Sequence, residues 1–258
     1  MFSLTKWYLD LVTDQGTVLI VYAATLEWAA LRVHYASTFV ARSGAQPVEH
    51  RAWSHVRMPA IDGESLRFAH GGLGVRGEWT REAASLHATL LDDADGRLDW
   101  RCFTPSGRAS VALAGEPIEG RGYAECLTMT RLPWTLPLRR LHWGRYASAA
   151  HNAVWIDWSI GPARRWVWFD GTIQPEASVD DDGVFAVDGA WDIRMRPVRR
   201  LCDRRALEVI SVHLPALGDL PIGPLKHMLE TKFLKRGTLS RDGARVDDGW
   251  VIDELVAW

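Results

Sequence analysis

The chain has 258 residues, of which 47% are hydrophobic and 24% charged, and its formal net charge is −2. These values are typical of a globular domain protein and exclude a disordered chain, and the charge gives no overall positive field for nucleic acid or an anionic membrane. The three cysteines, Cys102, Cys126 and Cys202, are odd in number and far apart. This spacing argues against a disulfide framework and favours a reducing compartment.

The N-terminal segment, MFSLTKWYLD, lacks the basic and apolar regions of a signal peptide, and no apolar run reaches the length of about 18 residues that a membrane span needs. We therefore expect a soluble, cytoplasmic protein with no integral membrane segment. No His or Cys pair has metal-ligand spacing, and neither a P-loop nor a G-x-S-x-G motif is present. We expect no metal, no cofactor and no nucleic-acid partner; the oligomeric state stays open.

Short alternating segments typical of β-strands follow one another through the first half of the chain. They cover residues 6–13, 16–24, 27–40, 65–70, 74–80, 83–91 and 97–104. Turn signals separate them, among them Asp14-Gln15, Asp62-Gly63, Asp95-Gly96 and Pro105-Ser106-Gly107. Strands at this spacing predict a β-barrel or sandwich.

Ala114–Gly122 (AGEPIEGRG) is rich in glycine and predicts a boundary between two domains, residues 1–116 and 117–258. Beyond it, strand-like segments resume at residues 123–130, 141–148, 153–159, 165–170, 183–187, 190–197, 206–214 and 249–258. Leu225–Leu234 has apolar residues at helical spacing and predicts one short helix near the C-terminus. The sequence thus predicts an all-β protein of two β-barrel or sandwich domains packed together, with one short helix.

Six of the fourteen tryptophans fall between Tyr123 and Gly171. Aromatic walls with a few placed polar groups are typical of a pocket for a hydrophobic ligand. Strand alternation puts Tyr123 and Glu125 on one face of their strand, and Trp143 and Arg145 on one face of the next, with His142 on the opposite face. Glu125 is a candidate buried acid and Arg145 its candidate partner; the alternative is a structural ion pair.

Asp157 lies in the centre of VWIDW, although Asp is depleted in strand interiors. A protonated Asp157 would donate a proton to an alkene, and an ionised one would steady a carbocation beside tryptophan faces. The alternative is a structural partner for a backbone N–H or an arginine. The candidate catalytic residues are Asp157, Glu125 and Arg145, and the candidate ligand-binding residues are Tyr123, Trp143, Trp155 and His142.

Several segments resemble the AttH and carotenoid 1,2-hydratase family of lipocalin-like proteins. They are KWYLDLVTDQG at 6–16, G-x-G-Y at 120–123, LHWGRY at 141–146, VWIDW at 154–158 and GWVIDELVAW at 249–258. The resemblance implies two lipocalin-like β domains with a ligand site, and Asp157 matches the family's later Asp. Where carotenoid hydratases carry Asp-His-Asn, this chain has Ala124-Glu125-Cys126, so a reaction other than carotenoid hydration stays open.

Three functions are compatible with these features. The first is an enzyme that hydrates, cyclises or isomerises an isoprenoid or polyene, and the second is a non-catalytic carrier of a small hydrophobic ligand. The third is a carbohydrate-binding module that stacks sugars on exposed tryptophans. The third predicts coplanar tryptophans that face solvent, and the first two predict enclosed ones.

Overall fold

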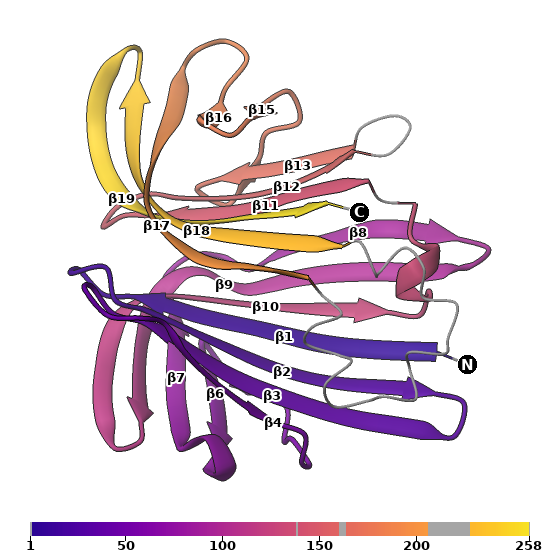
Figure 1. Ribbon diagram of the computed structural model, residues 1–258. Helices are drawn as coiled ribbons and strands as arrows, with labels where there is room; N and C mark the ends of the chain where they lie inside the picture. Colours follow the sequence, from indigo (N-terminus) through magenta and orange to yellow (C-terminus); the bar gives the residue numbers. More distant parts are fainter. Residues whose placement is uncertain (1, 138, 160–163, 206–227, 258) are drawn as a thin grey trace. The chain divides into compact units, whose positions relative to one another are not determined.

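The computed structural model describes residues 2–137, 139–159, 164–205 and 228–257. These residues form nineteen strands in two antiparallel sheets, with two short 3-10 turns, η1 (Gly71–Leu73) and η2 (Pro133–Thr135) (Figure 1). The all-β, two-domain prediction is confirmed. In the described part of the chain no helix has the length and apolar character that crossing a bilayer would require.

The first compact unit, Met1–Leu132, contains a ten-stranded sheet with the order β4-β3-β2-β1-β10-β9-β7-β6-β5, in which β8 also pairs with β9. Its strands are β1 (Phe2–Val12), β2 (Val18–Trp28), β3 (Leu31–Ala41), β4 (Val48–Ala52), β5 (Ala60–Asp62), β6 (Ser65–His70), β7 (Val75–Arg81), β8 (Leu86–Asp93), β9 (Gly96–Leu113) and β10 (Glu116–Met129). The sheet curves around a core to which β1 contributes Trp7, Leu9 and Leu11, at the alternate positions that a strand points to one face.

The second unit, Pro133–Trp258, contains a nine-stranded sheet with the order β14-β13-β12-β11-β19-β18-β17-β16-β15. Its strands are β11 (Arg140–Ala147), β12 (Asn152–Ser159), β13 (Arg164–Phe169), β14 (Thr172–Ile173), β15 (Ser178–Val179), β16 (Gly183–Phe185), β17 (Trp191–Arg205), β18 (Leu229–Arg241) and β19 (Ala244–Ala257). This sheet also curves (Figure 1), and its core includes Tyr146, Trp155, Val167 and Val251. We call the face of the sheet that carries these residues its inner face.

The boundary between the units differs from the one predicted at residues 116/117. Ala114 and Gly115 form a hairpin turn, and β10 pairs with both β9 and β1, so residues 117–129 lie in the first sheet. A glycine-rich hairpin turn and a linker between domains have similar compositions, so composition alone does not separate them. The pairing of β10 with β1, which is distant in the sequence, does.

Pro105-Ser106-Gly107 was predicted as a turn and is instead part of β9. The register shifts here, since Thr104 pairs with Ala124 and Gly107 with Gly122. The segment is therefore an irregularity of the β-bulge type within a continuous strand, which proline and glycine also favour.

The predicted helix at Leu225–Leu234 is wrong where the structure describes it. Residues 229–234 belong to β18, which pairs with β17 on one side and β19 on the other; residues 225–227 lie outside the described residues, as does the strand predicted at 206–214. The helical spacing rested on Leu225, Met228 and Leu229, and pairing along two neighbouring strands outweighs this weak local signal.

Candidate functional site

The inner face of the second sheet changes from apolar to polar along its strands. On β12, Ala153 and Trp155 are fully buried, and the next residue on this face, Asp157, has a side chain that is 16% exposed. Opposite them on β11 lie Tyr146, which is buried in the core, and then His142. Polar side chains thus gather at the end of the inner face that lies beyond the apolar core.

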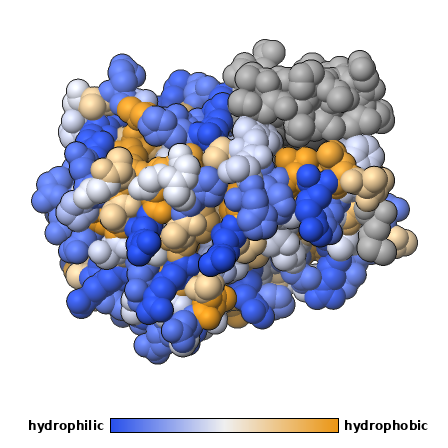
Figure 2. All heavy atoms as spheres, turned by 90° about the horizontal axis from the view of Figure 1, so that it is seen from below, coloured by the Kyte–Doolittle hydropathy of each residue, from blue (hydrophilic) through white to orange (hydrophobic). Residues whose placement is uncertain are grey.

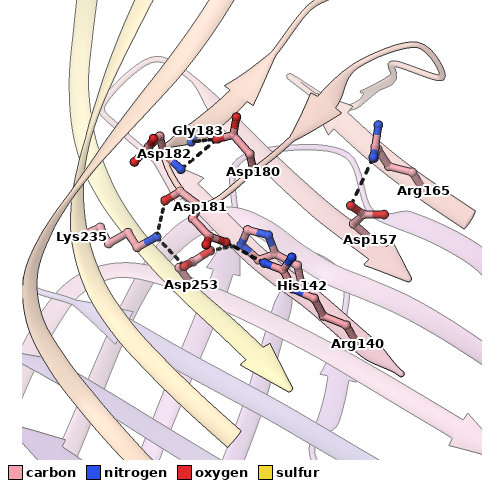
Figure 3. A network of polar contacts seen from close by, with 10 residues as sticks. All are labelled: Arg140, His142, Asp157, Arg165, Asp180, Asp181, Asp182, Gly183, Lys235 and Asp253. Atoms are coloured by element: carbon pink, nitrogen blue, oxygen red, sulfur yellow. Dashed lines mark hydrogen bonds and ion pairs between the residues drawn. The ribbon is translucent and has the colours of Figure 1, made fainter. Parts of the chain in front are cut away.

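A chain of three buried ionisable groups crosses this polar region (Figure 3). His142 Nε2 lies 2.5 Å from Asp253 Oδ1, and Lys235 Nζ lies 2.6 Å from Asp253 Oδ2. The three side chains come from β11, β19 and β18, which are neighbours in the sheet, and each side chain is at most 5% exposed. Buried charges of this kind persist only when they are paired.

The turn between β15 and β16 also contacts this network (Figure 3). The carbonyl oxygen of Asp181 accepts a hydrogen bond from Lys235 Nζ at 3.0 Å, and its carboxylate accepts one from the guanidinium of Arg140 at 2.7 Å. Lys235 is therefore held from two sides, by Asp253 and by the turn.

The surroundings of Asp253 keep its carboxyl group ionised. Burial by itself raises the pKa of Asp253, but the hydrogen bond and charge of His142, followed by the ammonium of Lys235, outweigh burial and hold the pKa below its ordinary value of 3.8. An ionised carboxylate only accepts hydrogen bonds, so His142 Nε2 carries the hydrogen. His142 Nδ1 is then the nitrogen that can take up a proton.

This lowered pKa predicts a loss of stability in acid. A carboxyl group with a folded-state pKa below its unfolded value stabilises the fold fully above the unfolded pKa, here about 3.8, and loses that contribution as the pH falls through the folded value. Urea unfolding of the wild type and of Asp253→Asn between pH 3 and pH 6 should show a difference that is constant above about pH 5 and shrinks below about pH 4. A difference that does not vary with pH would contradict this linkage.

Gly144 lies opposite both Trp155 and Asp253 in the strand register. A Cβ at this position would overlap atoms of the Trp155 indole ring. The glycine therefore allows the ring to lie against the backbone of β11, beside His142; the His142 and Trp155 ring centroids are 6.3 Å apart and the rings are perpendicular.

Gly144→Ala is expected to lower the free energy of unfolding by about 1–3 kcal/mol, because the added methyl group must displace a buried indole. Chemical denaturation measures the loss, and near-UV circular dichroism reports the moved tryptophan. Gly71→Ala is the control, since a Cβ there meets no atom within 4 Å; we expect a change within about 0.5 kcal/mol.

Asp157 pairs with Arg165 rather than with the buried network. The two residues are cross-strand partners, and Arg165 Nη2 lies 3.3 Å from Asp157 Oδ2. Arg165 also donates a hydrogen bond to the carbonyl oxygen of Ala177 at 3.1 Å. Figure 3 shows this pair beside the His142–Asp253–Lys235 network with no interaction drawn between them. This ion pair with an arginine is what the structural alternative for Asp157 expects.

Trp143 and Arg145 lie on the opposite face of the sheet from Trp155. The register pairs Trp143 with Ile156 and Arg145 with Val154, whereas His142 is paired with Asp157. Strand alternation separated His142 from Trp143 correctly, but two of the candidate ligand-binding residues, Trp143 and Trp155, lie on opposite faces of the sheet in this register. His142, and not Trp143, shares the face of Trp155 and Asp157.

Glu125 and Tyr123 lie on β10 in the first sheet, and Arg145 lies on β11 in the second, so the two strands are not the paired neighbours that the sequence prediction assumed. The Tyr123 hydroxyl and the Trp100 Nε1 donate hydrogen bonds to Glu125 Oε2 at 2.5 and 2.6 Å. Burial, then the proximity of Cys102 and Glu125, raises the pKa of Tyr123 well above its ordinary value. These bonds make Glu125 an acceptor held by two donors within the first unit.

Asp253 and Lys235 are the two members of the buried network that the sequence prediction missed. Asp253 lies in WVIDEL, an apolar strand segment with a central Asp, and this is the signal that singled out Asp157 in VWIDW. The same argument therefore applies to Asp253. Lys235 gives no such signal, because a lysine in a strand ordinarily faces solvent.

The tryptophans that the structure describes do not form an exposed binding surface. Of the fourteen, only Trp258 lies outside the described residues, and none of the others is among the exposed large hydrophobic side chains. On the face shown in Figure 2, hydrophobic residues form several patches between hydrophilic ones. The carbohydrate-binding alternative requires exposed, coplanar rings and gains no support.

A hollow of about 1080 Å³ lies in the first unit, and none of the predicted site residues lines it. It is lined largely by polar side chains near the β1–β2 turn, β9 and β10, including Arg42 and Glu116, whose side chains pair at 2.7 Å. A hydrophobic ligand would find few apolar contacts there. The buried network of the second unit remains the better candidate for chemistry.

No family model and no curated protein matches this chain. Solved structures do match it. A protein provisionally named AttH, from Nitrosomonas europaea, has a TM-score of 0.60 and 10% sequence identity, over 98% of this chain and 92% of its own. CghA has a TM-score of 0.59 and 10% identity, over 99% and 88% of the two chains. Kievitone hydratase from Nectria haematococca has a TM-score of 0.55 and 9% identity, over 98% and 88%.

Identities this low establish the fold and not the activity. They confirm the similarity in architecture that the segments around residues 6–16, 141–146 and 249–258 predicted. The chain has the two-domain, lipocalin-like fold of the AttH-like proteins.

Proposed function

We propose that this chain is an enzyme of the hydratase or cyclase type that acts on a small, unsaturated, hydrophobic molecule such as an isoprenoid. The observation that carries the proposal is the buried network in which Asp253 holds His142 on the inner face, beside Trp155. Support also comes from the fold, which is shared with a protein named as a hydratase.

His142 is the proposed proton-transfer group. Asp253 accepts the Nε2 hydrogen and so fixes the tautomer and the ring orientation, which is the role a carboxylate plays beside a catalytic histidine. Nδ1 then takes a proton from water and returns it to carbon, since an imidazole exchanges protons near neutral pH. Lys235 keeps Asp253 ionised and is a positioning residue.

This assignment changes the role predicted for Asp157. Asp157 forms an ion pair with Arg165 at the partly exposed end of the inner face. We propose that Asp157 and Arg165 orient polar parts of the ligand, and that His142 replaces Asp157 as the acid in the aromatic site.

Turnover in H₂¹⁸O tests the function. The wild-type protein is incubated with a panel of isoprenoids, polyenes and unsaturated ketones, and products are analysed by mass spectrometry. A hydratase adds one ¹⁸O-labelled water to the substrate mass, and a cyclase or isomerase changes retention time without changing mass. A panel member that binds but never changes indicates a carrier, and would contradict the enzymatic proposal.

A further inference from the structure

The indole N–H of Trp155 is a buried donor for which the described part of the chain offers no acceptor. Trp155 is fully buried, and its Nε1 has no hydrogen-bond partner. Buried indole N–H groups ordinarily have a partner, because an unsatisfied donor in a low-dielectric interior costs free energy. The group is therefore suited to an oxygen atom that is not part of the chain.

This donor lies beside the proposed proton-transfer group. Trp155 and His142 share the inner face, with ring centroids 6.3 Å apart. Nε1 is one of the atoms that a Cβ on Gly144 would meet, and Gly144 is the cross-strand partner of Asp253. The donor is thus placed on the backbone of β11, between the two strands that carry Trp155 and Asp253.

We propose that the Trp155 N–H binds the carbonyl oxygen of the substrate, and that the substrate is an α,β-unsaturated carbonyl compound to which the enzyme adds water. This inference rests on the proposed function and narrows it. An imidazolium is too weak an acid to protonate an isolated alkene readily, whereas a conjugated carbonyl accepts the electrons of the double bond and needs only a donor at its oxygen.

The reaction balances with water as the only co-reactant. His142 Nδ1 takes a proton from water while the water oxygen bonds to the β-carbon. The π electrons move to the carbonyl oxygen, and the resulting enolate accepts the hydrogen bond of Trp155 Nε1. The imidazolium then returns its proton to the α-carbon as the carbonyl re-forms, so that one H and one OH are added and His142 is restored.

The test compares trans-chalcone with 1,3-diphenylpropene, in which a methylene group replaces the carbonyl. Calorimetric titration of the wild-type protein should show tighter binding of chalcone. Trp155→Phe keeps an aromatic ring and removes the donor, so we expect chalcone affinity to fall about tenfold while diphenylpropene affinity stays the same. The infrared carbonyl stretch of ¹³C-labelled chalcone should lie at lower frequency in the wild type than in Trp155→Phe.

Trp158→Phe is the matched control. Trp158 is also buried and its Nε1 also has no partner among the described residues, but it lies on the opposite face of β12. It should leave chalcone binding and the carbonyl frequency unchanged. Failure of the wild type to bind chalcone, equal binding of the two ligands by the wild type, or an equal effect of both variants would overturn the inference.

The outcomes separate this inference from the proposed function. Loss of turnover in His142→Gln together with unchanged carbonyl binding in Trp155→Phe would reject the substrate class and leave the proton-transfer role standing. If His142→Gln keeps its turnover and Trp155→Phe keeps its carbonyl binding, both the substrate class and the proton-transfer role are rejected. The wild-type comparison of the two ligands needs no variant, so a Trp155→Phe protein that fails to fold does not block the test.

Discussion

Asp253→Asn is expected to lower the free energy of unfolding by about 3–5 kcal/mol, the largest stability effect that this structure predicts. Asp253 is fully buried and is the only carboxylate in the three-residue network, so the substitution leaves the Lys235 ammonium without its counter-charge. Breaking one side of a buried ion pair is costly because the remaining charge stays out of water. Equilibrium urea unfolding at pH 7 measures the effect.

Two further variants test this explanation. Asp157→Asn removes a carboxylate from a partly exposed pair and should lower the free energy of unfolding by no more than about 1 kcal/mol. Combining Asp253→Leu with Lys235→Met removes both charges and should recover part of the loss, since a buried ion pair can be exchanged for apolar groups at little net change. A loss below about 1 kcal/mol in Asp253→Asn would show that Lys235 is solvated in the folded protein.

His142→Gln is expected to lower the turnover rate about 10²- to 10⁴-fold, which is the usual contribution of general acid–base catalysis. Glutamine offers an amide N–H to Asp253 and so preserves the hydrogen bond, but it does not exchange protons near neutral pH. The rate is measured on the substrate that the H₂¹⁸O screen identifies. The affinity for the ligand should change much less than the turnover rate, because the aromatic side chains of the site are unchanged.

The stability of His142→Gln serves as its control. If the network were only structural, activity would follow the fraction of folded protein, and unfolding curves at the assay temperature would account for the loss. We expect the variant to be fully folded in the assay, with retained affinity and lost turnover. An activity loss explained entirely by unfolding would assign the network to the fold alone.

Strand alternation predicted much of the fold and part of the site. Period-2 patterns placed the strands of 65–70 and 153–159 nearly at their observed bounds, and the same reasoning separated His142 from Trp143. Alternation describes one strand at a time, however. It does not show which side chains of β11 lie on the same side of the sheet as a given side chain of β12. The register, which pairs His142 with Asp157, supplies this information.

Long-range pairing explains the remaining differences. Asp253 is 111 positions from His142 in the chain, so no local pattern brings them together. Glu125 and Arg145 are only twenty positions apart, but β10 and β11 belong to different sheets, so the strand pairing that the sequence analysis assumed for them does not occur. The helix predicted near the C-terminus failed for the same reason, since β18 is fixed by two neighbouring strands and not by its own propensity.

The most direct measurement of the central claim compares His142→Gln with Asp157→Asn in single-turnover reactions in H₂¹⁸O, with both proteins shown to be folded. The two residues are cross-strand partners on one face, so the comparison isolates which of them transfers the proton. We predict that His142→Gln loses label incorporation and that Asp157→Asn retains it within about tenfold. Loss of incorporation in Asp157→Asn with full incorporation in His142→Gln would contradict the assignment of His142.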